Sequence, residues 1–423
     1  MKSRIFLGCC IALILTGFGC HNSNPVAPIK EQPPTLTVEE SNCTEVWLKI
    51  SIPSSNNGIV TLKRDTTVID TIRLMNTDTT MVDANLQPSH TYTYTLALAC
   101  TTNVTAQART MDTTSHAFTW QSFTFGDGGG SCVLNDVAII NDTLAYAVGD
   151  IYTGGLHYNF AKWNGNNWTL GVTSDTGYIF GVNYCVYAFG PNDIWIGSSI
   201  LEHWDGTRWI FYGSTRGYQN AFAIRKIWGT SSNDLYFVGD GGNIRHYNGT
   251  NWTQISSGTT LDVRDLWGAQ NATTGSLEIY ATAGDPLISP ARTVLQINGT
   301  TAQAISLVGV SRALNSIWFS PGQYYWLVGD GFWEKHPTLS TSSWISQTLS
   351  QYSPEAVRGN ALNDVFICGD FGEMLHYNGV WWKSYISQTG IDGAYLGLSV
   401  SGNTVIAVGY LSSSQAIILM GRR

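Results

Sequence analysis

The chain of 423 residues is poor in charge: Asp, Glu, Lys and Arg make up only 12% of it, and the formal net charge is −8. Clusters of Lys and Arg are missing, and such clusters supply much of the affinity of proteins for nucleic acid. Cysteine pairs of the C-x-x-C kind, which form zinc and redox sites, are missing as well. The composition therefore argues against a nucleic-acid partner, and we expect neither a metal nor a cofactor.

Motifs of familiar enzyme classes are also lacking. The sequence contains no Ser-His-Asp signature and no Gly-rich phosphate loop, and the segment Asp127-Gly128-Gly129-Gly130 lacks the further acidic ligands of a calcium loop. Aromatic residues are abundant by contrast, with 16 Trp and 20 Tyr, and 43% of the chain is hydrophobic. This composition is typical of an uncharged, aromatic-rich extracellular β protein.

A motif returns along the last three quarters of the chain with a period of roughly 40–50 residues. Each unit contains a hydrophobic run, a Gly, an aromatic residue and a Trp. The clearest copy reads Ile227-Trp228-Gly229, Asn233-Asp234-Leu235-Tyr236, Val238-Gly239-Asp240-Gly241, His246-Tyr247-Asn248-Gly249 and Trp252. The Gly that ends the second run recurs at Gly149, Gly197, Gly239, Gly284, Gly329, Gly369 and Gly409. This spacing predicts seven propeller blades.

Each unit holds four short β-rich runs separated by turn residues. The Asn-Gly and Asp-Gly pairs between the third and fourth runs, such as Asn248-Gly249, predict tight type I′ hairpins. The last unit ends at Arg423 without a fourth run, and a matching run, Phe118–Phe123, precedes the first unit. We therefore expect an N-terminal strand to complete the last blade and close the ring.

Residues 116–423 resemble the bacterial seven-bladed β-propellers of the kelch-like, photosystem-assembly-like and Asp-box-like group. The resemblance implies an all-β fold. The resemblance does not imply the activity of any of these families. Asp240 and Asp370 interrupt the Gly pair of kelch repeats, and the turn after Tyr247 lacks the spacing of an Asp-box.

The N-terminus combines the basic residues Lys2 and Arg4 with an apolar stretch, Ile5–Leu15, that is too short to span a membrane. With Gly19 before Cys20, residues 1–19 resemble a lipoprotein signal peptide. The resemblance implies lipidation of Cys20 and an outer-membrane or cell-surface location in the bacterial envelope, with a lipid anchor as the only membrane contact. Residues 20–34 then read as an extended tether.

Residues 35–115 form a second module of alternating runs. Its segment Asp83–Tyr94 resembles the tyrosine corner of a fibronectin type III or related immunoglobulin-like sandwich, with Leu86, Pro88 and Tyr92 carrying the pattern. The resemblance implies a β-sandwich that serves as a spacer. The pairing of Cys43, Cys100, Cys132, Cys185 and Cys368 stays open.

Several repeated polar residues are predicted to be structural. His203, His246 and His376 occupy one position in separate blades, too far apart to share a metal. The Asp residues after the repeated Gly, such as Asp240 and Asp370, are predicted to cap turns rather than to form a hydrolytic carboxylate pair. We also expect one set of aromatic residues to pack between blades: Trp228, Trp267 and Trp318.

Binding is predicted on the face that carries the loops between second and third strands and the blade-to-blade connections. Long connections with aromatic and Arg side chains converge there, and polar residues stand at aligned positions of the first strands, where blade packing favours apolar ones. The candidate binding residues are Tyr152, His157, Arg216, Tyr218, Arg225, Arg264, Arg292, Asn315 and Glu355.

Three functions fit these features. The leading hypothesis is a non-catalytic binding protein displayed at the cell surface, whose propeller face recognises a protein or a glycan. A polysaccharide hydrolase or lyase is an alternative, for which only Glu355 approaches an isolated catalytic acid. An envelope assembly scaffold is the third. The oligomeric state stays open.

We expect Cys20→Ser to release the protein from membranes, measured by fractionating cells. Each buried methylene of an acyl chain contributes about 0.8 kcal/mol, so stable anchoring needs the several chains of a lipoprotein cysteine. Wild-type protein that is soluble and has an unmodified N-terminal mass would contradict the anchor.

Overall fold

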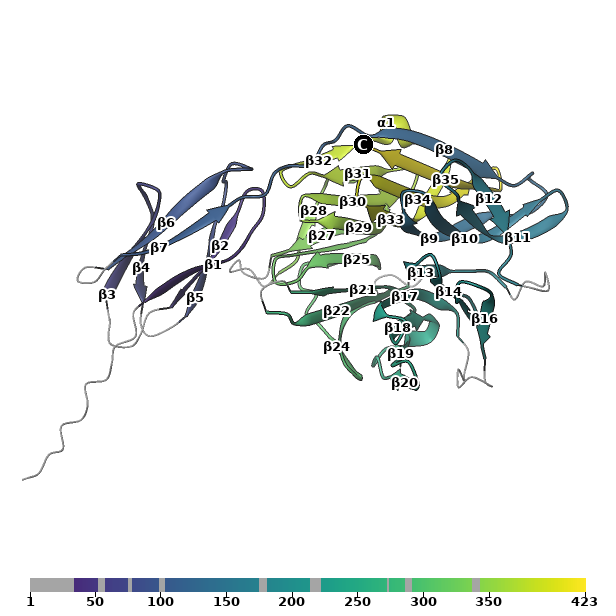
Figure 1. Ribbon diagram of the computed structural model, residues 1–423, viewed down its shortest axis with the longest axis horizontal. Helices are drawn as coiled ribbons and strands as arrows, with labels where there is room; N and C mark the ends of the chain where they lie inside the picture. The colour runs from purple at the N-terminus through teal and green to yellow at the C-terminus, as the bar shows by residue number, and fades with distance from the viewer. Residues whose placement is uncertain are drawn as a thin grey trace, which may run out of the picture.

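The computed structural model describes residues 34–51, 58–74, 78–98, 103–174, 181–213, 222–271, 274–285, 291–336 and 343–423. The fold is all-β, and its strands form antiparallel sheets (Figure 1). Two candidate binding residues, Arg216 and Tyr218, lie outside the described residues, as do Cys20 and Cys100. Among the described residues, no helix is both long enough and apolar enough to cross a membrane.

The N-terminal module, defined here as β1–β7, consists of two sheets around an apolar core built on Val46, Leu48, Leu62 and Tyr94. Tyr92 is buried, and its hydroxyl accepts a hydrogen bond from the Gln87 N–H at 2.9 Å, the contact that a tyrosine corner predicts. One sheet has the order β1 (Thr35–Ser41), β2 (Val46–Ser51), β5 (Thr79–Asp83), and the other β4 (Thr67–Leu74), β3 (Gly58–Arg64), β6 (Thr91–Leu98), β7 (Val104–Arg109).

The remainder of the chain forms repeated four-stranded antiparallel sheets, which is the construction of a β-propeller. In order along the chain, the first three sheets are β9 (Val133–Asn141), β10 (Leu144–Thr153), β11 (Leu156–Trp163), β12 (Trp168–Gly171); β13 (Cys185–Gly190), β14 (Asp193–Gly197), β15 (Leu201–Trp204), β16 (Trp209–Tyr212); and β17 (Ile224–Ser231), β18 (Asp234–Gly239), β19 (Asn243–Tyr247), β20 (Trp252–Ile255).

The next sheets are β21 (Val263–Gln270), β22 (Leu277–Gly284), β23 (Arg292–Asn298), β24 (Thr301–Ala304); β25 (Leu314–Ser320), β26 (Tyr324–Gly329), β27 (Gly331–Lys335), β28 (Ile345–Gln347); and β29 (Pro354–Ala361), β30 (Asp364–Gly369), β31 (Met374–Tyr377), β32 (Trp382–Ser384). A short helix, α1 (Ile386–Thr389), leads to the last sheet: β33 (Gly393–Ser401), β34 (Thr404–Leu411), β35 (Gln415–Arg422) and β8 (Thr119–Phe125).

The first strands of neighbouring sheets lie side by side, and β33 lies beside β9, so the sheets form a closed ring around a central channel. The predicted closure is confirmed, because β8 pairs antiparallel with β35 from Thr119↔Arg422 to Ala416↔Phe125. In Figure 1 the blue β8 lies next to the gold β35. An edge that would otherwise be exposed is thereby paired.

Four of the turns between third and fourth strands differ from the predicted type I′ hairpins, whereas the turn between β23 and β24 is a two-residue loop, Gly299-Thr300. Tyr247 pairs with Trp252, so the loop has four residues rather than two. The Asn248 side-chain oxygen accepts hydrogen bonds from the N–H groups of Thr250 and Asn251 at 3.1 and 2.7 Å, and Gly249 has φ +86°. The Asn side chain therefore replaces the ladder bond that a two-residue turn would make.

The N-terminal module contacts the ring at β26 and at His336, just after β27, through a polar and aromatic interface. The Glu45 carboxylate accepts a hydrogen bond from the Tyr324 hydroxyl at 2.9 Å and lies 3.5 Å from His336 Nε2. Trp47 is buried and stacks on His336, with ring centroids 5.1 Å apart and an angle of 6° between the planes. These contacts hold the module in one orientation at the side of the ring (Figure 1).

Ring closure yields a stability prediction. Phe118, just before β8, is buried against Phe366, Trp120 and Tyr385. We expect Phe118→Ala to lower the free energy of unfolding by about 3 kcal/mol, as loss of a core aromatic does, measured by denaturant unfolding. The control Gln121→Ala, at an exposed position of β8, should change it by less than about 0.5 kcal/mol. Equal effects of the two changes would contradict closure by this segment.

Candidate functional site

The first strands carry β-bulges that aim polar side chains at the channel. Ile224 pairs with Gly239 and Lys226 pairs with Val238, which leaves Arg225 as an extra residue in its strand. A bulge bends the strand and redirects the side chain of the extra residue. Five other first strands carry the equivalent bulge, with the extra residues Asn135, Arg264, Asn315, Glu355 and Leu396, whereas β13 stays in register at this position.

The bulge residues line one end of the channel. We call this end the polar mouth and define it by Asn135, Tyr184, Arg225, Arg264, Asn315 and Glu355. Two adjoining cavities of about 170 and 80 Å³ open there and share the first four of these residues. The mouth lies on the face with the turns between second and third strands, because each bulge is next to the Gly that ends the second strand. Four candidate binding residues are therefore brought together.

The two arginines of the polar mouth are held differently. Arg225 forms a bidentate ion pair with Asp240, with distances of 2.6 and 3.0 Å, and its guanidinium lies 4.3 Å from the centroid of the Tyr184 ring. Arg264 donates from Nε to the Gly284 carbonyl at 3.1 Å. Within the described part of the chain, no carboxylate lies at ion-pair distance from Arg264. Arg264 is therefore the cation of this mouth that remains available to an anionic group.

Glu355 is acidic, as is Asp262, which also lines this end of the channel and accepts a hydrogen bond from the Gly241 N–H at 2.8 Å. Oε2 of Glu355 accepts a hydrogen bond from Asn315 Nδ2 at 2.8 Å. The pKa of Glu355 is raised to about 7, mainly by burial and also by Asp370 and Asp330, while Arg264 opposes the increase. The pKa of Asp370 is raised as well, by burial and by Asp330. Near neutral pH the mouth can therefore gain or lose a proton at Glu355.

Two ion pairs lie deeper in the channel, and we call them the channel pairs. Lys226 Nζ lies 2.8 Å from both carboxylate oxygens of Asp136. Arg358 binds Asp265 at 2.6 and 2.9 Å. Both carboxylates also accept backbone N–H groups, from Val186 at 3.1 Å and from Ile317 at 3.0 Å. Such partners satisfy charges that would be costly to bury alone.

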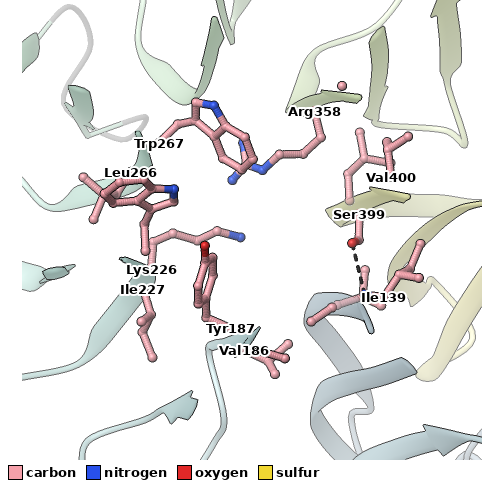
Figure 2. Close-up of a pocket in the computed structure, with 16 residues that line it drawn as sticks. Ile139, Val186, Tyr187, Lys226, Ile227, Leu266, Trp267, Arg358, Ser399 and Val400 are labelled. Atoms are coloured by element: carbon pink, nitrogen blue, oxygen red, sulfur yellow. Dashed lines mark hydrogen bonds between the residues drawn. The ribbon is translucent and has the colours of Figure 1, made fainter. Parts of the chain in front are cut away.

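The opposite end of the channel is lined by aromatic and aliphatic side chains together with Lys226 and Arg358. This aromatic cavity, about 170 Å³, is lined by Tyr187, Trp228 and Trp267 together with Ile139 and Val400. Figure 2 shows Lys226 and Arg358 reaching toward its interior from two sides. The sequence analysis missed this cavity and the channel pairs. Asp136, Lys226 and Asp265 each directly follow a bulge residue, which is a signal in the sequence, but Arg358 lies three residues after Glu355 and carries no such signal.

The remaining candidate residues within the described ranges do not line the polar mouth. Tyr152 stacks on His157 with ring centroids 4.3 Å apart, and His157 Nε2 lies 2.7 Å from Asp150 Oδ1. Arg292 donates from Nη2 to the Val310 carbonyl. These side chains are held on β10, β11 and β23.

The repeated His residues are structural, as predicted. His246 Nε2 lies 2.6 Å from Asp234 Oδ1, and its ring stacks on Tyr236 at 4.4 Å. His203 and His376 make the same kind of contact with Asp193 and Asp364, at 2.9 Å each. Among the described residues, no group of three or more His, Cys, Asp or Glu side chains is placed to hold a metal ion.

The Asp residues after the repeated Gly differ from the prediction that they cap turns. The carboxylate of Asp240 binds Arg225, and that of Asp150 binds His157. The backbone N–H groups of Asp240, Asp330 and Asp370 instead donate to the carbonyl just before the first strand of the same sheet. The carboxylates of Asp330 and Asp370 add negative charge near Glu355.

The predicted packing of Trp between sheets is observed for Trp228 and Trp318, whereas Trp267 is only partly buried and lines the aromatic cavity. Trp228 lies against Gly268, where an added Cβ would come within 2.5 Å of the indole ring, and Trp318 lies against Gly359 in the same way at 2.9 Å. Trp228 and Trp318 are both buried. Glycine at these positions permits the close approach of neighbouring first strands.

One residue near the polar mouth has an unusual backbone. Phe371, in the turn after Asp370, has φ +55°, whereas the equivalent turn after Asp240 has Gly241 at φ +67°. The left-handed region costs an ordinary residue roughly 1–2 kcal/mol. The Phe371 side chain is 51% exposed and lies 4.8 Å from the Tyr352 ring, centroid to centroid.

Cys43, Cys132, Cys185 and Cys368 are buried free thiols. Burial raises the pKa of Cys43 to about 11, and the pKa values of Cys185 and Cys368 are also raised by burial. Thiols of this kind stay protonated near neutral pH and are poor nucleophiles.

The sequence matches no protein-family profile and no curated protein. Among solved structures, the fold is similar to that of "YCF48 bound to D1 peptide", with 16% identity and a TM-score of 0.54 over 72% of this chain and 95% of that chain. It is also similar to YCF48 from Cyanidioschyzon merolae, with 15% identity and a TM-score of 0.51 over 72% and 98% of the two chains. At these identities the likeness supports the β-propeller fold alone.

The raised pKa of Glu355 predicts a pH-dependent effect on stability. Folding is disfavoured as pH rises from the ordinary value of 4.5 to about 7, because the unfolded state ionises first. We expect Glu355→Gln, whose amide oxygen can still accept the Asn315 hydrogen bond, to stabilise the protein at pH 8 by at most about 3 kcal/mol. Thermal melts should show this gain fading at pH 4, and a gain independent of pH would contradict it.

Proposed function

We propose that the protein is a non-catalytic binding protein whose polar mouth recognises a polypeptide segment of a protein partner. The observation that carries this proposal is the placement of Arg264, which has no carboxylate partner among the described residues, beside Glu355 and Asn315 on bulges of adjacent first strands. Opposite charges and amide groups in one cavity match the charged side chains and the N–H and C=O groups of a polypeptide.

A polypeptide fits the polar mouth better than a glycan. Recognition of sugars relies on exposed aromatic rings, and the aromatic ring that lines this mouth, Tyr184, is covered by the Arg225 guanidinium. The solved structure of the similar propeller YCF48 carries a peptide of D1. That neighbour supports a protein partner here as well, although its identity to this chain is low.

Phe371 offers an apolar anchor next to the charged mouth. Its ring is half exposed, and its turn carries Asp370, which acts electrostatically on Glu355. A strained backbone conformation that exposes a large aromatic side chain lowers the stability of the fold. Residues with such strain are found preferentially at functional sites. Exposed aromatics beside charged groups are frequent anchors of protein interfaces.

The remaining features fit a protein displayed in the bacterial envelope. We propose seven blades within residues 116–423, a fibronectin type III-like spacer in residues 35–115, a tether in residues 20–34 and a lipoprotein signal in residues 1–19 with lipidation at Cys20. The order of the N-terminal sheets and the Tyr92 contact support the spacer. The four-stranded sheets support the blades. An outer-membrane or cell-surface location would make the polar mouth accessible to partners in the envelope or outside the cell.

A polysaccharide hydrolase or lyase is the second candidate, and one observation favours it. Glu355 has a pKa of about 7 and is influenced by the carboxylates Asp370 and Asp330. A carboxyl group with such a pKa can act as a general acid near neutral pH. Turnover of a polysaccharide that Glu355→Gln abolishes would establish this function instead.

The binding proposal can be tested with a library of random peptides of about 12 residues displayed on phage and selected on the purified protein. We expect selected peptides to carry basic and acidic residues close together. Arg264→Ala should weaken their binding by about 1–2 kcal/mol, roughly 5- to 30-fold, measured by fluorescence anisotropy. Arg208→Ala is the matched control, because Arg208 is exposed in a turn between third and fourth strands on the opposite face.

Phe371→Gly is a second test variant. It removes the aromatic side chain but keeps the backbone conformation, because glycine adopts the left-handed conformation without strain. We expect this variant to keep the stability of the parent within about 1 kcal/mol and to bind the selected peptides more weakly. The proposal fails if no peptides are selected, or if Arg264→Ala and Phe371→Gly bind as well as Arg208→Ala.

A further inference from the structure

The aromatic cavity is chemically separate from the polar mouth. Its walls come from the later residues of the first strands, on the far side of the channel pairs from Arg264 and Glu355. Lys226 and Arg358 line both spaces, and their bonds to Asp136 and Asp265 occupy the channel between them. A ligand of this cavity would therefore be recognised independently of the function proposed for the mouth.

The walls of the cavity are held in place by contacts with one another and with the neighbouring strands. Trp228 is fixed against Gly268, and the Arg358 guanidinium lies 5.2 Å from the centroid of the Trp267 ring. The Tyr187 hydroxyl donates to the Gly229 carbonyl at 3.1 Å. The surface is therefore formed before any ligand binds, which reduces the entropic cost of binding.

The cavity opens to solvent at one end. Rim residues such as Ile139, Ala188 and Val400 are partly exposed, whereas the Lys226 and Arg358 side chains at the floor are only 16% and 8% exposed. Figure 2 shows the Lys226 ammonium and the Tyr187 hydroxyl pointing into the space that these residues enclose. A ligand can therefore enter past the rim and reach a polar floor.

The floor supplies a hydrogen-bond donor but no net charge. An ammonium group has three N–H donors, and the bonds of Lys226 to described residues both go to Asp136. One donor is thus left for a ligand. Because Lys226 and Arg358 are each paired with a carboxylate, a neutral oxygen is a better match for the floor than a carboxylate.

We propose that the aromatic cavity binds a single aromatic ring that carries a neutral oxygen, such as a phenol. The volume of about 170 Å³ suits this class, since an apolar cavity of about 150 Å³ holds one benzene molecule. The ring packs between Tyr187, Trp228 and Trp267, and its oxygen accepts a hydrogen bond from Lys226.

The test uses p-cresol as the probe and the full chain as the protein. We expect saturable binding of p-cresol by calorimetry, at least fivefold tighter than binding of toluene, which has the same ring but no oxygen. Ala188→Phe should weaken p-cresol at least tenfold by filling the cavity from its rim. The control Ala304→Phe, at an exposed position of β24, should leave binding unchanged, as should Arg264→Ala at the polar mouth.

A further arm compares p-cresol with the peptide Gly-Tyr-Gly. Binding of both would identify the tyrosine side chain of a partner as a possible source of the ring, and binding of p-cresol alone would point to a free small molecule; either result supports the ring site. Absence of p-cresol binding, equal binding by Ala188→Phe, equal affinity for toluene, or preference for methyl glucoside would overturn the proposal.

Discussion

Pairing of β8 with β35 is the constraint on which the centre of the molecule depends. The two strands are joined by seven matched residue pairs although they lie at opposite ends of the repeat region. Their pairing completes the cores on both sides of the closure, one around Phe118 and Tyr395 and the other around Trp163 and Ile418. Only a closed ring places β33 beside β9, and only then do all first strands face one channel.

A closed ring brings polar side chains from different sheets close together, so each must find a partner. The channel pairs do this for the residues that follow the bulges, by linking β9 with β17 and β21 with β29. Burying these charges is favourable only because additional backbone and hydroxyl donors, including Ser316, complete their coordination. The same pairs divide the channel into a charged end and an aromatic end, so one scaffold presents two surfaces of opposite chemistry.

Much of the architecture could be predicted from local patterns in the sequence. The repeated Gly and the hydrophobic runs predict sheets that the structure contains, and the unmatched run at Phe118–Phe123 predicts the pairing of β8. The roles of His246 and Trp228 followed from their repetition. The prediction of a type I′ turn at Asn248-Gly249 was wrong. The Asn248 side chain accepts hydrogen bonds within a four-residue loop, and the preference of a dipeptide does not reveal the length of that loop.

The sequence by itself determined the repeat, the strands and the aligned polar positions at Arg225, Arg264, Asn315 and Glu355, because periodicity and alternation are properties of neighbouring residues. Only the tertiary structure decided what surrounds them. A bulge is defined by the partner strand, and the pairing of Lys226 with Asp136 joins residues of different sheets. The lack of a carboxylate partner for Arg264 among the described residues, the raised pKa of Glu355 and the aromatic cavity all depend on distances across the ring. No local sequence pattern encodes these distances.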